Sequence, residues 1–319
     1  MNDAAAWPDM PFAAWSDTVA TLHLWTQIVG KTRLALTPWI NHGWQVPLYV
    51  SARGLTTSPI PFGNEILEIE FDFIGHRLVA RTSRGEERAL ALEPQTVANF
   101  YARYMDVLTD IGVAVAINEM PNELANPIRF SQDRVHAAYD AAAARRFWRA
   151  LVQIDRVLKR FRSGFLGKSS PVHFFWGSFD LAVTRFSGRA APLHPGGVPG
   201  LPDAVTREAY SHEVSSAGFW PGNAAFPQAA FYSYAYPEPA GFRDRVVTSG
   251  AHFDDALHEF VLPYGTVRSA ADPDALLLDF LSSTYAAAAD AGNWDRAALE
   301  GPIGVPARVR PLAARGRPK

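Results

Sequence analysis

Cysteine is absent from this 319-residue chain, which excludes disulfide bonds and thiolate chemistry. No apolar run approaches the roughly 18 residues that a membrane-spanning helix requires. The N-terminus lacks a basic segment followed by an apolar one, so we expect no secretory signal. Together these absences predict a cytoplasmic protein that does not interact with a membrane.

Lysine is scarce, and the chain has no strong excess of either charge. The only lysines are Lys31, Lys159, Lys168 and Lys319. A net charge of −2 at pH 7 gives no reason to expect nucleic acid as a partner. Basic residues gather only in the segment 301–319, for which we expect a disordered, solvated tail.

The familiar catalytic and nucleotide-binding motifs are also missing. Gly30-Lys31-Thr32 and Gly167-Lys168-Ser169 share the end of the phosphate-binding loop. The first glycine of that motif is replaced by Trp25 in one copy and Arg162 in the other. We therefore expect each glycine to end a helix, with the lysine near the last carbonyls.

Aromatic and ionisable residues are concentrated in the stretch 170–189, SPVHFFWGSFDLAVTRFSGR. Aromatic bulk beside a few ionisable groups is typical of small-molecule pockets. A second polar run follows at 210–216, YSHEVSS. The two runs supply the candidate catalytic residues His173, Asp180, Arg185, Tyr210, His212 and Glu213.

A divalent metal is one possible occupant of this site, with His173, His212 and Glu213 as its ligands. Adjacent residues on a regular strand face opposite ways, so only one of His212 and Glu213 would then face the pocket. The alternatives are metal-free acid–base or binding roles, or histidines that are hydrogen-bonded core residues.

Two arginines are candidates for binding a carboxylate or phosphate with both guanidinium nitrogens. Arg53 has an alternative as an ion-pair partner of Glu68, Glu70 or Asp72. For Arg185 we expect burial and a carboxylate partner, with Asp180 first among the candidates and Glu213 next, because an unpaired buried charge is very costly.

Hydrophobic periodicity and turn residues predict an α+β protein. The expected helices cover 15–29, 95–110, 140–161 and 273–291. The expected strands cover 33–36, 46–52, 65–73, 76–82, 88–92, 113–117, two within 170–189, 210–216 and 230–236.

The two halves resemble each other, which predicts an internal duplication. Both run helix, Gly-Lys-(Ser/Thr), strands, helix and glycine. We divide the chain into a first half at 1–120, a connector at 121–131, a second half at 132–300 and the tail at 301–319. We expect the halves to pack about a pseudo-two-fold axis with a cleft between them.

Several strings resemble a bacterial protein family, the domain of unknown function 5996. They are LHLWTQIVGKTRLAL, LYVSARGLTTSPIP, SPVHFFWGSFDLAVTRFSGR, REAYSHEVSSAGFWPG and FYSYAYPEP. The resemblance runs from about Trp7 to Glu300 and implies one full-length unit in a cytoplasmic bacterial protein. The family has no assigned activity, so the resemblance implies no catalytic residue.

The function we expect from the sequence is an enzyme that acts on a small molecule in the cleft between the halves. The alternative is a non-catalytic protein that binds a small molecule. Density of titratable groups is the feature that favours the enzyme.

Overall fold

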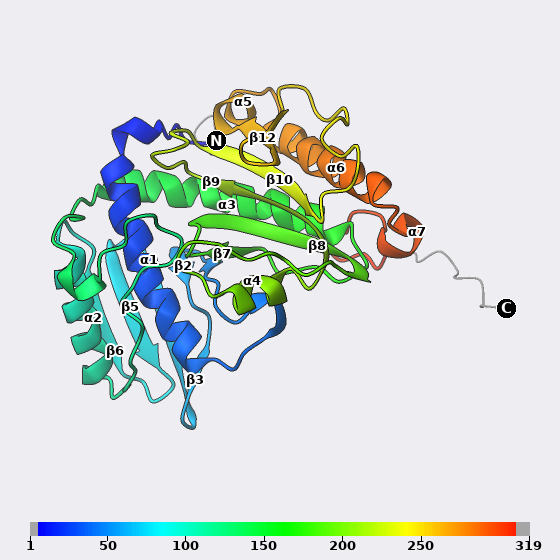
Figure 1. Ribbon diagram of the computed structural model, residues 1–319. Helices are drawn as coiled ribbons and strands as arrows, with labels where there is room; N and C mark the ends of the chain where they lie inside the picture. The colour runs from blue at the N-terminus through cyan, green and yellow to red at the C-terminus, as the bar shows by residue number, and fades with distance from the viewer. Residues whose placement is uncertain (1–5, 311–319) are drawn as a thin grey trace.

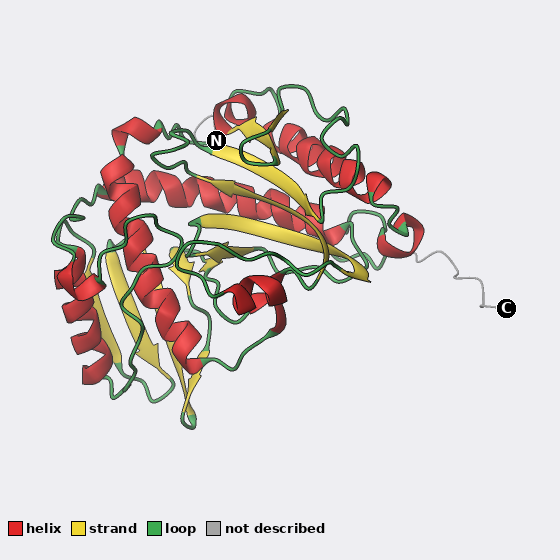
Figure 2. Ribbon diagram, in the orientation of Figure 1, coloured by secondary structure: helices red, strands yellow, loops and turns green. Residues whose placement is uncertain are grey.

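A computed structural model describes residues 6–310 of the chain. Within these residues the fold is α+β, with seven α-helices and two antiparallel sheets of six strands each (Figures 1 and 2). None of the described helices is both long enough and apolar enough to span a membrane. The last nine residues of the expected tail lie outside the described part.

The first sheet contains the strands of the N-terminal half in the order β1-β2-β4-β5-β6, with β3 paired to β4. The longest strand, β4, alternates buried Leu67, Ile69 and Phe71 with more exposed acidic residues, as expected for a half-buried strand. The strands are β1 (Tyr49–Val50), β2 (Gly54–Thr56), β3 (Ile60–Phe62), β4 (Glu65–Asp72), β5 (Arg77–Thr82) and β6 (Glu87–Ala91).

The second sheet has the order β11-β12-β10-β9-β8-β7. Helices α3 (Ala141–Ser163) and α6 (Pro273–Ala291) contact its central strands and each other, and Figure 1 shows α3 crossing behind them. The opposite face of the sheet carries the site described below. The strands are β7 (His173–Phe175), β8 (Asp180–Ala190), β9 (His212–Trp220), β10 (Ala230–Tyr236), β11 (His252–Asp254) and β12 (Glu259–Pro263).

The two sheets meet at one antiparallel bridge. Leu48, just before β1, and Phe174 in β7 exchange both backbone hydrogen bonds, at 2.8 and 2.7 Å. Both side chains are fully buried. The edge strands β1 and β7 are therefore held together, which joins the two halves into one packed structure. The remaining helices are α2 (Val97–Asp110), α4 (Asp203–Ala209), α5 (Tyr264–Arg268), α7 (Arg296–Leu299) and the short 3₁₀ turns η2 (Phe12–Ala14), η3 (Asn41–Gly43) and η4 (Phe130–Gln132).

Helix α1 (Ser16–Leu36) corrects the sequence interpretation of its C-terminal part. The expected stop at Gly30 and the expected strand at 33–36 are wrong, because the helix continues through both. A β-carbon on Gly30 would lie 2.2 Å from the Trp176 ring. This glycine therefore permits close packing of Trp176 against the helix and does not terminate it.

The other long helices and the central strands agree with the sequence interpretation to within a few residues. The expected strand at 113–117 is wrong, since this segment has no regular structure. The two Gly-Lys motifs are not equivalent, because the first lies inside α1 and the second in the loop after α3. Strand order follows the chain in both sheets apart from β3 and β11, and the duplication stays a prediction.

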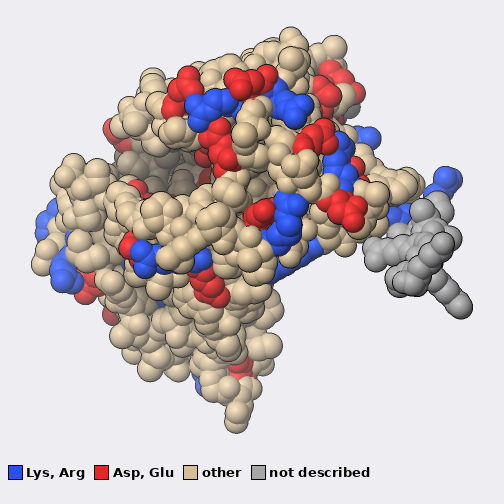
Figure 3. All heavy atoms as spheres, turned by 45° about the vertical axis from the view of Figure 1, so that its right-hand side comes forward, with Lys and Arg blue, Asp and Glu red and all other residues tan. Residues whose placement is uncertain are grey.

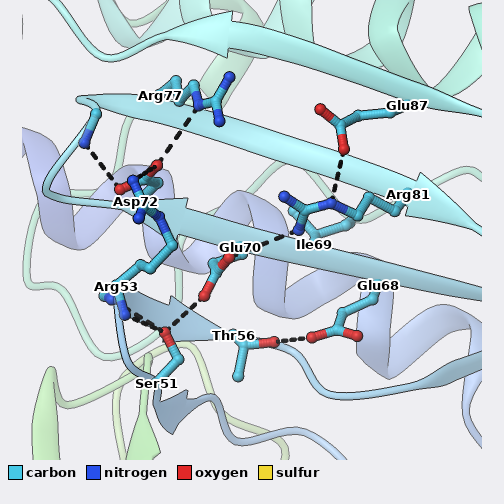
Figure 4. A network of polar contacts seen from close by, with 12 residues as sticks. Ser51, Arg53, Thr56, Glu68, Ile69, Glu70, Asp72, Arg77, Arg81 and Glu87 are labelled. Atoms are coloured by element: carbon cyan, nitrogen blue, oxygen red, sulfur yellow. Dashed lines mark hydrogen bonds and ion pairs between the residues drawn. The ribbon is translucent and has the colours of Figure 1, made fainter.

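The polar face of the first sheet carries a network of ion pairs (Figure 4). Arg53 Nη2 lies 2.8 Å from Asp72 Oδ2, and Arg81 bridges Glu70 and Glu87 across three strands. Burial acts to raise the pKa of Asp72, but hydrogen bonds from Gly75 and Arg53 outweigh it and lower that pKa. Of the two roles considered for Arg53, the structure supports the ion pair.

Candidate functional site

Three carboxyl groups and several phenols gather on the face of the second sheet that points away from α3 and α6. Asp180 begins β8, and its phenolic neighbour Tyr232 lies two strands away on β10. Glu259 on β12 is two residues from Val261, the cross-strand partner of Tyr232, and so shares its face. The third carboxyl belongs to Glu123 in the connector between the halves.

Asp180 is the best-defined member of this group, which we call the carboxyl site. Its side chain is buried, with the residue 6% exposed. Oδ1 accepts a hydrogen bond from Ser178 Oγ at 2.8 Å, and Oδ2 accepts one from the Tyr232 hydroxyl. Burial raises the pKa of Asp180 to about 6, although these hydrogen bonds act to lower it.

The other two carboxyls are shifted in the same direction. Burial, followed by the charge of Asp180, raises the pKa of Glu123 to about 7. Burial, then the charges of Asp180 and Asp254, raises the pKa of Glu259 to about 8. Because the charge of Asp180 acts on both glutamates, their titrations are linked to that of Asp180, and the raised pKa values lie in the neutral range.

The position of Glu123 is fixed by helix α1. Gln27 donates to the carbonyl of Asn122 at 2.9 Å and accepts from its amide at 2.8 Å. One turn further along, Lys31 Nζ donates to the carbonyl of Met120 at 2.6 Å. The polar side of α1 therefore holds the connector in place over the second sheet, and with it the carboxyl of Glu123.

Gly177 lies where α1, the connector and the turn before β8 meet. A β-carbon there would lie 2.0 Å from Glu123 Oε1, so any larger residue would require the carboxyl of Glu123 to move. Its carbonyl is 2.7 Å from His23 Nε2, which identifies that nitrogen as the donor. Burial lowers the pKa of His23 to about 4, so this histidine is neutral at pH 7.

Two non-glycine residues at the site adopt a left-handed backbone conformation. They are Glu123 itself, with φ of 59°, and Phe179, with φ of 60°, which precedes Asp180. This conformation is unfavourable for a bulky side chain and is found disproportionately at functional sites. Both strained residues position a carboxyl of the site.

Aromatic side chains surround the carboxyls. The hydroxyls of Tyr210 and Tyr234 are 2.7 Å apart, and Trp220 stacks on Tyr232 with ring centroids 5.3 Å apart. Burial raises the pKa of Tyr210 to about 12 and that of Tyr232 and Tyr234 well above the usual value. The phenols are therefore protonated donors at neutral pH.

The surface of the molecule is hollowed on the face shown in Figure 3, and acidic atoms lie at the edge of the hollow. Two small cavities, of about 60 and 150 Å³, lie elsewhere and are lined by Glu213 and Arg185 respectively with residues of α6. Neither of these cavities is lined by Asp180, Glu123 or Glu259.

The structure brings together only part of the set predicted from sequence. Asp180 and Tyr210 lie at the carboxyl site. Arg185 is on the opposite face of the sheet, as the odd spacing from Asp180 requires, with its guanidinium carbon 3.5 Å from the Phe161 ring centroid. Its expected pairing with Asp180 or Glu213 is wrong, because its bonding partner is the Phe161 carbonyl.

The three proposed metal ligands do not converge. Glu213 binds Arg189 at 2.6 Å, His212 lies beside His42 with ring centroids 5.8 Å apart, and His173 packs edge-on against Phe175. Among residues 6–310 there is no group of three or more histidine, aspartate or glutamate side chains that could hold a metal ion. The metal interpretation is therefore not supported by this arrangement.

Glu123, Tyr232 and Glu259 were not candidates from sequence. Tyr232 shares a strand face with Tyr234 and Tyr236, a pattern more typical of a core. Glu123 stands in an aperiodic connector and Glu259 before a short apolar run. Neither position carries a local signal, because both join the site only through tertiary packing.

Comparison with known proteins adds one finding. The sequence profile described as "Family of unknown function (DUF5996)" matches residues 7–301. No curated protein and no solved structure matches the chain.

Proposed function

The chain belongs to the family of unknown function DUF5996, and we propose from its carboxyl site that it is an enzyme using general acid–base catalysis on a small polar molecule. One observation carries this proposal: three carboxyls gather with buried phenols on one face of the second sheet, where burial raises the pKa values of Asp180, Glu123 and Glu259 to about 6, 7 and 8. Carboxyl groups whose pKa values are raised toward the operating pH can act as general acids and bases.

The roles follow from the order of the pKa values. Near pH 7 Asp180 is the group that most readily stays ionised, which suits it to accept a proton. Glu259 is the one that stays protonated, which suits it to donate. Glu123 lies between them in pKa. Tyr232 and Ser178 orient the carboxylate of Asp180, so they are positioning residues.

The charge of the site restricts its substrate. No cation among residues 6–310 acts on the pKa values of the three carboxyls. Such a site disfavours an anionic molecule, so the substrate is neutral or cationic where it meets them. The phenols supply hydrogen bonds to polar groups, and the stacked Trp220 and Tyr232 supply an apolar wall. This combination suits a small hydroxylated or amine-bearing compound.

We keep a non-catalytic binding protein as the second candidate because the aromatic rings beside the carboxyls also fit recognition of a cation. The proposal also includes a cytoplasmic location and a small-molecule partner. The absence of cysteine and the net charge of −2 support a cytoplasmic protein and a small-molecule partner rather than nucleic acid.

The test compares wild-type protein with Asp180→Asn and Glu259→Gln after incubation with a pool of small metabolites, followed by mass spectrometry. Glu213→Gln is the matched control, because Glu213 pairs with Arg189 away from the site. An enzyme depletes one compound with wild type and the control, but not with the two variants. A compound retained without depletion identifies a binder, and equal behaviour of all four proteins contradicts the proposal.

A further inference from the structure

A second group of polar residues lies where the two halves meet, and the acid–base proposal does not use it. It contains the end of α1, η3 and the segment after it, strand β1, the loop before β7, and strands β7 and β8. We call it the basic cluster. Its ionisable members are Arg33, His42, Lys168 and His173.

Ring and cation contacts connect the members of the cluster. The guanidinium of Arg33 lies 5.3 Å from the Tyr49 ring, which is 6.3 Å from the His173 ring. Trp44 lies 6.5 Å from His173 and 5.3 Å from Lys168 Nζ. The five side chains thus form a continuous group with aromatic walls.

Phe186, His42 and His212 extend the group around Lys168. Lys168 Nζ is 5.0 Å from the Phe186 ring, and it also contacts His42 Nε2. His42 Nδ1 lies 3.0 Å from the carbonyl of Ala209 and is therefore the protonated nitrogen, which leaves Nε2 to accept from the lysine. His212 stands 5.8 Å from His42.

Several buried donors in this cluster have no partner within residues 6–310. They are Nη1 of Arg33, Nε2 of Gln45 and one ring nitrogen of His173; the other ring nitrogen of His173 is an acceptor, also without a partner, because burial lowers the pKa of His173 to about 3 and keeps the ring neutral. Arg33 is 7% exposed, and Gln45 and His173 are fully buried. Burying unpaired polar groups and charges is costly, so their retention here requires a compensating interaction.

No carboxylate within the described residues supplies that interaction. Arg33 bonds to the carbonyl of Gln45, and neither Arg33 nor Lys168 takes part in an ion pair there. The carboxylate of Glu208, on the adjacent α4, accepts from the Trp39 indole. The cluster is therefore positive and lined by donors.

From this convergence of unpartnered buried donors, two cations and aromatic walls, we propose that the basic cluster binds the oxyanion group of a small organic acid, a carboxylate or a phosphate. Arg33 offers a planar fork that matches either group. Lys168 is more exposed and contributes a charge at the outer edge. Trp44 and Tyr49 would contact the body of the molecule.

The proposal is tested by isothermal titration of the full chain with two probes, inorganic phosphate and benzoate, in a buffer without other oxyanions. Both carry the recognised group, and only benzoate carries a ring to pack on Trp44. Wild-type protein is expected to bind at least one probe saturably. Trp44→Ala should lower the affinity for benzoate and leave the affinity for phosphate nearly unchanged, because only benzoate has a ring that packs on the Trp44 indole.

Lys168→Met should lower the affinity for the probe that binds wild type by about tenfold. Arg33→Lys should lower it by at least as much, because lysine cannot form the two parallel hydrogen bonds of a guanidinium. Lys159→Met is the control, since Lys159 lies on the exposed side of α3 in a pair with Asp155, and its affinity should stay at the wild-type value. If Arg33→Lys does not fold, the affinity of Lys168→Met is sufficient to test the proposal, because Lys168 is exposed and its replacement should not disturb folding. Absence of saturable binding, or equal affinity in Lys168→Met and Lys159→Met, overturns the proposal.

Discussion

Arg185 is a buried cation whose hydrogen-bond partner is a backbone carbonyl rather than a carboxylate, although the charge of Glu300 also favours its charged form. Its guanidinium lies 3.5 Å from the Phe161 ring and 4.3 Å from the Tyr285 ring, and it donates to the Phe161 carbonyl. Burial, the largest influence, lowers its pKa to about 10, so the group is charged at pH 7. Sequence reasoning correctly expected burial here but wrongly expected an acidic partner, because stacking between two helices leaves no sequence pattern.

Replacing Arg185 by alanine should therefore lower the free energy of unfolding by about 2–4 kcal/mol, from a desolvated cation–π contact and a charged hydrogen bond. Denaturant melts measure the change. Arg88→Ala is the control, because Arg88 is 52% exposed and lies 4.0 Å from Asp110, and it should unfold near the wild-type midpoint. Equal midpoints for both variants would show that Arg185 contributes no stability.

The shifted pKa of Glu259 predicts how stability depends on pH. Its folded value of about 8 lies above the ordinary value of 4.5. The folded state therefore keeps a proton that the unfolded state releases, and the resulting stability is present below about pH 4.5 and lost as pH rises through 8.

Between pH 5 and pH 8.5 the wild type should therefore lose stability relative to Glu259→Gln, which has no proton to release, by on the order of 4 kcal/mol. Urea melts at the two pH values give this difference. Glu213→Gln should follow the wild type. A Glu259→Gln variant with the same pH slope as wild type would mean that the carboxyl is ordinary.

At the scale of elements, the long periodic helices and the longer strands of both sheets could be predicted because burial on one side imposes a period. The short strands β2, β3, β11 and β12 were not expected. The sequence prediction ended helix α1 too early, at Gly30, because glycine often marks the end of a helix. The glycine is instead required by Trp176, which comes from the other half of the chain. Packing between distant segments is the information that the local pattern lacks.

Gly30→Ala should accordingly destabilise the protein by about 1–3 kcal/mol through overpacking against Trp176, despite the better helix propensity of alanine. Gly265→Ala in α5 is the matched control, because a β-carbon there meets nothing within 4 Å, and it should leave stability unchanged or slightly raised. Thermal melts compare the two. If both substitutions stabilise, the Trp176 ring does not constrain α1.

At the scale of the molecule, the two halves share their core and their sites. Helix α1 is buried around most of its circumference, as is typical of a helix enclosed by other elements. Its neighbours include Trp176 and Gly177 of the second half. The carboxyl site likewise combines the connector with the second sheet, which explains why Glu123, Tyr232 and Glu259 could not be found from local stretches of sequence.

The first half should therefore not fold alone. A fragment of residues 1–131 is expected to give a poorly dispersed amide spectrum and no cooperative melt, since α1 would lose its cover. Mixing it with the fragment 132–319 should restore dispersion. A cooperative melt of 1–131 by itself would show that the halves are independent domains.

The central claim, that three carboxyl groups of one site hold protons near neutral pH, is tested most directly by following carbon-13 signals of side-chain carboxyls as pH is varied. The signals are assigned with Asp180→Asn, Glu123→Gln and Glu259→Gln. We predict three titrations with midpoints of about 6, 7 and 8, with the midpoints of Glu123 and Glu259 lowered when the charge of Asp180 is removed. Titration of all three below about pH 5, as for solvated carboxyls, would contradict the account.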